Sequence, residues 1–178
     1  GYTGTGYTID RWKSLEASVT TTIGSNGITI LANTEGRGLV QTLDNAVNET
    51  VTFSALVTEV SHEGSICSYL WVDGGSFDPW VRKESTKPGL VTLTIPKGTF
   101  SGGVKRVLFF AFAGESVTIK AAKLELGSTQ TLAHQDSDGN WVLNEIPDYG
   151  EELRKCQRYQ IAFDDTVHCY GHACYDND

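Results

Sequence analysis

Aromatic and charged residues between positions 69 and 82 form the first group whose side chains could bind a ligand. Tyr69 and Trp71 alternate on one face of an expected strand, and Trp80 falls in the expected loop 74–88 that follows it. Sugars present flat C–H faces that stack on aromatic rings, while amide or carboxylate groups fix their hydroxyls. The expected ligand-binding residues are therefore Trp80, Tyr69, Trp71, Asp78 and Arg82. The alternative is that the face carrying Tyr69 and Trp71 is simply part of the core.

A second group lies at 136–140 and has the residue types of a calcium loop. Asp136, Asp138 and Asn140 alternate as the first three ligands of such a loop do. Trp141 and Pro147, however, stand where that loop needs a glycine and a closing glutamate. We therefore expect a plain Asp-Gly turn and no metal here.

The cysteines and the C-terminal histidines form a third group. The residues His168, Cys169, His172 and Cys174 offer zinc-binding atoms, but their spacing is not that of a paired zinc knuckle. We expect no metal ion and no cofactor. Metal binding by these four residues and a Cys169–Cys174 disulfide are the two alternatives. Cys67 and Cys156, inside an expected strand and an expected helix, are predicted to be small core residues. The set lacks the framework of a secreted disulfide scaffold, so we expect reduced thiols made in a cytosol.

Several function classes are disfavoured by composition and motifs. The sequence contains no Gly-x-Ser-x-Gly, His-Glu-x-x-His or phosphate-binding glycine motif, so we expect no enzymatic activity. The formal net charge of −8 repels a polyanion, which argues against a nucleic-acid partner. No stretch approaches the about 18 apolar residues of a membrane span, so no membrane insertion is expected.

The elements that must position these residues are strands separated by turn chemistry. Alternating polarity is clearest at 50–60, and Gly and Pro pairs bracket 90–95. Strands are predicted at 18–23, 27–32, 38–43, 50–60, 66–72, 90–95, 107–113 and 116–126. Their spacing of about ten residues, without alternating helices, predicts an antiparallel sandwich or jelly roll.

Two of these strands have unusual patterns. Segment 107–113 is apolar on both faces, so its second face must be covered by a loop, by the C-terminal tail or by a neighbouring subunit. In segment 116–126 the apolar parity switches, from Val117 and Ile119 to Ala122 and Leu124. Such a switch predicts a β-bulge. Trp12 and Trp141 are expected to be structural anchors.

The predicted fold class is all-β: an antiparallel β-sandwich (jelly roll) followed by a short C-terminal helix. The helix begins near Asp148, where Asp148 and Glu151 form a capping pattern, and ends near Tyr159. The expected organisation is a jelly-roll sandwich at 1–128, a connector with the short helix at 129–160, and the start of a truncated C-terminal β segment at 161–178.

Motifs at both ends of the stretch 6–159 resemble a known group. The sequence Gly-Tyr-Thr-Ile-Asp-Arg-Trp at 6–12 resembles the opening of jelly-roll, carbohydrate-binding-like domains in bacteriophage and prophage tail proteins. Lys-Leu-Glu-Leu-Gly-Ser at 123–128, then Pro147 and Glu-Leu-Arg-Lys-Cys-Gln-Arg-Tyr at 152–159, resemble its closing signature. The middle of the stretch matches only in pattern, and the group supplies no fixed list of sugar-contacting residues.

This resemblance implies a virion component of a tail fibre or tail tip, made in the bacterial cytoplasm and assembled as a homotrimer. Receptor binding to a cell-surface glycan is the implied role. Two alternatives remain: a purely architectural fibre or assembly module without a ligand, and an accessory carbohydrate-binding domain of a larger glycan-degrading enzyme. Because Met is absent and the chain stops soon after Cys-Gln-Arg-Tyr, we expect a fragment of a longer protein. The sequence identifies neither the host nor the ligand.

Overall fold

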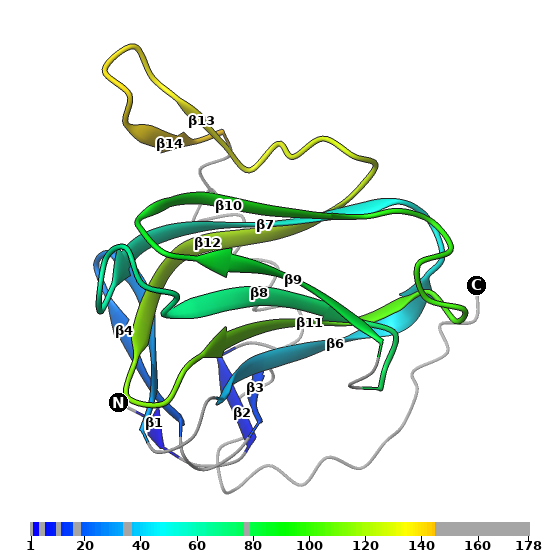
Figure 1. Ribbon diagram of the computed structural model, residues 1–178, viewed down its shortest axis with the longest axis horizontal. Helices are drawn as coiled ribbons and strands as arrows, with labels where there is room; N and C mark the ends of the chain where they lie inside the picture. The colour runs from blue at the N-terminus through cyan, green and yellow to red at the C-terminus, as the bar shows by residue number, and fades with distance from the viewer. Residues whose placement is uncertain are drawn as a thin grey trace, which may run out of the picture. The chain divides into compact units, whose positions relative to one another are not determined.

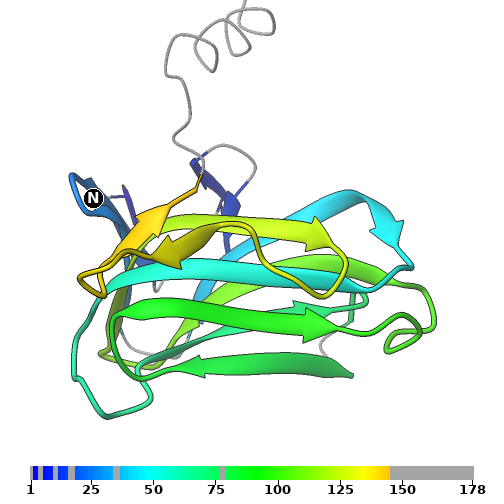
Figure 2. The same cartoon turned by 90° about the horizontal axis from the view of Figure 1, so that it is seen from above.

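Two six-stranded antiparallel β-sheets and one small hairpin form the computed structural model of this protein, which describes residues 2–3, 6–9, 12–15, 19–33, 37–76 and 79–144. The first sheet contains, in spatial order, β1 (Tyr2–Thr3), β4 (Val19–Gly24), β5 (Gly27–Ala32), β12 (Ser116–Leu126), β7 (Val51–Val60) and β10 (Gly89–Ile95). The second contains β2 (Gly6–Ile9), β3 (Trp12–Ser14), β6 (Arg37–Val47), β11 (Val104–Ala111), β8 (Ser68–Asp73) and β9 (Trp80–Ser85). Figures 1 and 2 show the two sheets packed face to face.

The strand order is that of a jelly roll. Four strands of the first sheet run in the order β5-β12-β7-β10, and four strands of the second run in the order β6-β11-β8-β9. The chain alternates between the sheets from β5 to β8 and again from β10 to β12, so that sequence neighbours lie on opposite layers. The predicted all-β sandwich is therefore confirmed for the described residues.

Alternating side chains build the core between the sheets. On β7, Val51, Phe53, Ala55 and Val57 point inward and are buried. The inward face of the second sheet includes Leu70 and Val72 of β8 and Val107 and Phe109 of β11. A continuous apolar layer of this kind supplies the main free energy that holds two sheets together. Trp12 stacks on Phe109 at 4.9 Å between ring centroids, as expected of an anchor.

The predicted bulge in β12 is confirmed. Pairing of β12 with β7 shifts register between Thr118 and Ile119 and again between Ile119 and Ala121. Ile119 therefore faces the core, whereas Ala121 packs on the outer face beside Leu56. The extra residue re-aims the strand, which is the physical origin of the parity switch in the sequence.

One prediction was wrong: segment 74–88 is not a continuous loop. Residues Trp80–Ser85 form β9, an edge strand whose partner is β8. The run Arg82-Lys83-Glu84 hides the strand pattern, because charged residues are rare in the middle of a sheet. At an edge they are favourable, since they discourage pairing with other chains. The predicted strand 66–72 also begins later, at Ser68.

A small hairpin covers part of the outer face of the first sheet. It is formed by β13 (Ala133–Gln135) and β14 (Trp141–Leu143). Trp141, Leu143 and Leu132 pack with Leu56 and Leu90 in a second apolar cluster. This hairpin confirms Trp141 as an anchor. Figure 2 shows the hairpin lying over β7 and β12.

The hairpin turn is the Asp-Gly turn expected from the sequence. Gly139 has a φ of +84°, and its amide donates to the Asp136 carbonyl at 3.1 Å. The Asp136 side-chain oxygen Oδ1 accepts hydrogen bonds from the amides of Asn140 at 2.8 Å and Asp138 at 3.0 Å. The carboxylate therefore uses its lone pairs to close the turn.

These hydrogen bonds predict a titration that can be observed directly. The amides of Asn140 and then Asp138 favour the charged form and hold the pKa of Asp136 below its ordinary value of 3.8. The turn is thus strengthened at neutral pH and loosens as the pH falls through the lowered pKa. We expect the Asp138 and Asn140 amide resonances to titrate with a midpoint below 3.8. Asp136→Asn, which keeps the acceptor oxygen, should abolish this titration, and a midpoint at or above 3.8 would contradict the assignment.

All described residues fall in the first of the two units into which the chain divides, between Glu145 and Ile146. The predicted C-terminal helix, the segment 161–178 and three cysteines (Cys156, Cys169 and Cys174) lie outside the described residues. Within the described ranges, no helix has the length and hydropathy needed to cross a bilayer.

Candidate functional site

The candidate site lies on the outer face of the second sheet, the face turned away from the core. Because Leu70 and Val72 of β8 point inward, Tyr69 and Trp71 point outward. The register places Trp71 opposite Arg82 of β9 and opposite Leu108 of β11. Trp71 is 11 positions from Arg82 and 37 positions from Leu108 in the sequence, yet the three residues share one surface across three neighbouring strands.

Five rings form a continuous cluster on this face, which we call the aromatic strip. Its members are Tyr69 and Trp71 on β8, Trp80 on β9, Phe110 on β11 and Phe112 just after β11. Trp71 lies 4.8 Å from Trp80 between ring centroids, and Tyr69 stacks on Phe110 at 4.6 Å with an interplanar angle of 7°. Three strands at about 4.8 Å spacing make the strip about 10 Å wide.

The middle of the strip is a support and not a contact surface. Tyr69 is only 6% exposed, because Phe110 stacks on its ring and the guanidinium of Arg82 lies 4.9 Å from its centroid. Burial raises the pKa of the Tyr69 hydroxyl, and the hydrogen bond and positive charge of Arg82 offset only part of that rise. Tyr69 therefore holds its neighbours in place.

The two ends of the strip are open. Trp80 and Phe112 are each 37% exposed, whereas Trp71 and Phe110 are half-buried. The strip thus presents two rings to solvent on a base of packed aromatic side chains. Side chains fixed by such packing lose little further entropy on binding a ligand.

Charged groups border the aromatic strip. Arg82 lies over Trp80 at 4.9 Å and within 3.9 Å of the Glu84 carboxylate, and both side chains are exposed. On the same face Asp73, opposite Trp80 in the register, is fully buried and receives two 2.8 Å hydrogen bonds from Arg106. The Arg82–Glu84 pair offers hydrogen-bonding groups to solvent, while the Asp73–Arg106 pair joins the end of β8, which lies opposite Trp80, to β11.

Four of the five residues predicted for ligand binding meet on this surface: Trp80, Tyr69, Trp71 and Arg82. The fifth, Asp78, lies outside the described residues. Phe110 and Phe112 were not predicted as site residues. The sequence indicated only that segment 107–113 is apolar on both faces, so that its second face must be covered. In the structure Leu108 is fully buried on that face, between Val40 and Trp71 in the register, so part of the cover comes from the same sheet.

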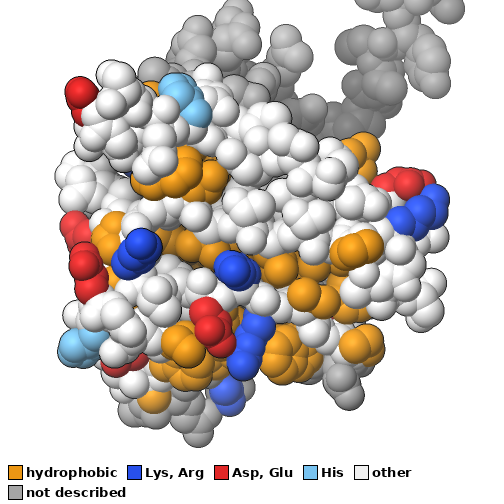
Figure 3. Space-filling model, turned by 45° about the horizontal axis from the view of Figure 1, so that its top comes forward, with side chains coloured by type: hydrophobic (Ala, Val, Ile, Leu, Met, Phe, Trp, Pro, Cys, Tyr) orange, Lys and Arg blue, Asp and Glu red, His pale blue; other side chains and the backbone are white. Residues whose placement is uncertain are grey.

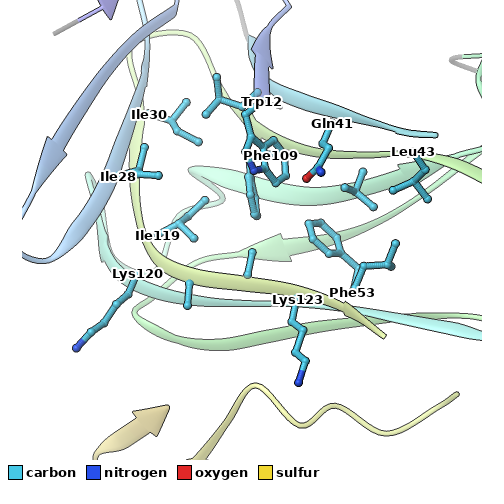
Figure 4. A pocket seen from close by; sticks show the side chains of 15 residues that line it. Trp12, Ile28, Ile30, Gln41, Leu43, Phe53, Phe109, Ile119, Lys120 and Lys123 are labelled. Carbon is cyan, nitrogen blue, oxygen red and sulfur yellow. The ribbon is translucent and has the colours of Figure 1, made fainter. Parts of the chain in front are cut away.

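A cavity of about 320 Å³ between the sheets is a weaker candidate (Figure 4). It opens beside β12, where pairing with β5 ends at Ile119. Trp12, Phe53 and Phe109 line its wall, and Lys120 and Lys123 point away from them, as Figure 4 shows. This mainly apolar wall offers few hydrogen-bonding partners, whereas charged groups border the aromatic strip.

On the face shown in Figure 3, the acidic side chains do not form one negatively charged patch. Acidic and basic side chains are interspersed there with apolar ones. Such a mixed surface neither concentrates nor repels a neutral ligand.

Comparisons with known proteins identify similar structures but no family. No family model matches the sequence, and no curated protein matches it. Among solved structures, a family 29 carbohydrate-binding module is similar with a TM-score of 0.44 and 11% identity, over 69% of this chain and 87% of that one. A xylan-binding module of family 15 has a TM-score of 0.44 and 15% identity, over 71% and 97%.

A third similar structure is the enzymatically active domain of bacteriophage CBA120 tailspike protein 4. Its TM-score is 0.47 and its identity 10%, over 67% of this chain and 20% of that one.

Proposed function

We propose that this chain is a non-enzymatic carbohydrate-binding module of a bacteriophage or prophage tail fibre or tail tip, and that its ligand is a cell-surface glycan. The observation that carries the binding role is the aromatic strip, with Trp80 and Phe112 open to solvent and Arg82 and Glu84 beside them. The residues proposed to bind are Trp80, Trp71, Arg82 and Asp78, with Tyr69 as their support.

The chemistry of binding follows from these groups. The apolar face of a pyranose ring stacks on Trp80, and removal of both surfaces from water supplies most of the free energy. Arg82 donates hydrogen bonds to sugar hydroxyls, and Glu84 accepts them. Affinity at one such open site is low, since a shallow surface buries little of the ligand. Several copies on one fibre would raise the overall affinity by avidity.

The tail setting, the homotrimer and the location on the virion rest on the sequence motifs at 6–12, 123–128 and 152–159. A trimer would present three strips toward the same cell surface, which is the arrangement that avidity requires. Light scattering on the native full-length chain tests this part separately, because it asks only for the oligomeric state.

Substitution of Trp80 tests the binding role. A glycan array identifies the best oligosaccharide for the wild-type protein, and titration calorimetry then measures its affinity. Trp80→Ala should weaken binding by about tenfold or more, because loss of the stacked ring removes about 1.4 kcal/mol or more. Ile23→Ala is the matched control: Ile23 is 72% exposed but lies on the first sheet, so its loss should leave the affinity unchanged.

A purely architectural module is the second candidate, and the burial pattern supplies an observation in its favour. Tyr69 and Leu108 are already buried on the outer face, while Phe112 and Ile66 are exposed at the end of it. An apolar surface of this kind also suits a contact between subunits. If no glycan binds, or if binding is indifferent to Trp80, the architectural role replaces the receptor-binding one.

A further inference from the structure

Three side chains with metal-binding atoms meet at one end of the sandwich, away from the core. His62 and Cys67 lie in the loop that joins β7 to β8, and Glu115 lies in the turn that joins β11 to β12 (Figure 1). The imidazole nitrogen, the thiol sulfur and a carboxylate oxygen all lie within 4.8 Å of one another. Glu115 is about 50 residues away in sequence, so only the fold brings this set together.

Backbone hydrogen bonds fix the loop and the turn against each other. The Ser61 amide donates to the Ser116 carbonyl at 3.0 Å, and the Phe112 amide donates to the Cys67 carbonyl at 3.0 Å. A further bond, from the Ser65 amide to the His62 carbonyl at 3.3 Å, closes the loop between His62 and Cys67. The three side chains therefore project from a framework that is held in place without any ligand.

The environment of the thiol is polar, although Cys67 is fully buried. Its sulfur donates to the His62 carbonyl at 3.1 Å, and Cys67 is not a member of the apolar cluster between the sheets. The His62 Nδ1 atom lies 2.8 Å from Glu115 Oε2, which also accepts a hydrogen bond from the Ser61 hydroxyl. A cysteine that only fills space would be expected to face apolar side chains.

We propose that Cys67, His62 and Glu115 form a binding site for a borderline divalent cation, with Zn²⁺ as the best match. Thiolate and imidazole are preferred ligands of Zn²⁺, and a carboxylate oxygen is its third usual type of protein ligand. Ca²⁺ and Mg²⁺ are excluded at this site because they take oxygen ligands and not sulfur. Water supplies the fourth position, since the His62 side chain is 66% exposed and leaves one side open.

Metal binding requires shifts of the ligand atoms of up to about 1.2 Å, because the three atoms lie within 4.8 Å of one another. Metal–ligand bonds of about 2.0–2.3 Å in a tetrahedron separate the ligand atoms by about 3.3–3.6 Å. The His62–Glu115 distance of 2.8 Å must therefore lengthen by about 0.5 Å, and the exposed imidazole is free to move outward. A bound ion would tie the β7–β8 loop to the β11–β12 turn. This inference stands independently of the proposed glycan binding.

Cobalt spectroscopy on a variant with a single thiol tests the site. Cys156, Cys169 and Cys174 are replaced by Ser, so that Cys67 is the only thiol, and Co²⁺ is added to the reduced, tag-free protein. We expect one equivalent of Co²⁺ to produce a thiolate-to-cobalt charge-transfer band with the visible bands of a tetrahedral ion, both removed by Zn²⁺. Because charge transfer needs a thiolate, histidines elsewhere cannot produce it.

Single substitutions in this variant assign the ligands. Cys67→Ser should abolish the charge-transfer band, and His62→Ala and Glu115→Gln should each weaken Co²⁺ binding by at least about tenfold. Glu115→Gln keeps shape and hydrogen bonding, so it remains informative if Cys67→Ser fails to fold. His134→Ala is the control, because His134 is exposed on the β13–β14 hairpin and bonds Asn144. A single-thiol protein without the band, or one indifferent to Glu115→Gln, overturns the proposal.

Discussion

Asp73→Ala is expected to lower the free energy of unfolding by about 3–5 kcal/mol, the typical cost of breaking one partner of a buried ion pair. Asp73 is fully buried and receives hydrogen bonds of 2.8 Å from the Arg106 Nε and Nη2 atoms. Its Oδ1 atom also accepts the Gly75 amide at 2.8 Å, so the same carboxylate closes the chain after β8. Loss of the carboxylate leaves Arg106, whose side chain is 15% exposed, without this counter-charge.

Denaturant unfolding measures this loss, and an exposed pair at the same distance is the control. Lys97 and Glu49 also approach within 2.8 Å, but their side chains are 58% and 61% exposed. Lys97→Ala should therefore cost about 0–1 kcal/mol. Since Asp73 lies opposite Trp80 in the register, the variant should also bind the glycan more weakly. Equal, small losses for Asp73→Ala and Lys97→Ala would refute the structural role given to the buried pair.

Gly38→Ala is expected to be at least as damaging, with a loss of more than about 4 kcal/mol or a failure to fold. A Cβ atom at this position would lie 1.5 Å from the Phe109 carbonyl oxygen and 2.6 Å from its carbon. Both atoms are backbone of β11, which pairs with β6 and β8 at the centre of the second sheet. The clash can be relieved only by separating β6 from β11, and β11 carries the Phe110 end of the aromatic strip.

A second glycine provides the matched control for this experiment. At Gly24, at the end of β4, the nearest atom to an added Cβ is the Gly27 carbonyl oxygen at 3.9 Å, an ordinary contact. Gly24→Ala should change stability by about 0.5 kcal/mol or less. Circular dichroism and thermal unfolding of the two variants compare them directly. A Gly38→Ala protein with wild-type stability would mean that β6 and β11 do not approach as closely as described.

Much of the fold could be predicted because it depends on patterns within single strands. The predicted strands 27–32 and 116–126 coincide with β5 and β12 to the residue. The bulge near Ile119 was visible as a change in apolar parity, since a strand places successive side chains on opposite faces. β9 was missed because its charged residues are tolerated at an edge, and edge position is a property of the whole sheet.

The candidate site was only partly predictable. Tyr69, Trp71, Trp80 and Arg82 lie within 14 positions of one another, so their types and their closeness in sequence pointed to a common surface. Phe110 and Phe112 joined them through the pairing of β11 with β8, which no local pattern reveals. The same is true of Glu115, whose approach to His62 depends on how two distant turns meet.

The sequence by itself determined which segments become strands, which of their faces are apolar and where turns interrupt them, because these follow from local alternation and turn chemistry. Only the tertiary structure decided which strands are neighbours and in what register. That step placed five rings on one face, formed the Asp73–Arg106 pair on the same face and brought a thiol, an imidazole and a carboxylate together. Such contacts cost loop-closure entropy that only the complete core repays, so they belong to the assembled sandwich and not to any one of its strands.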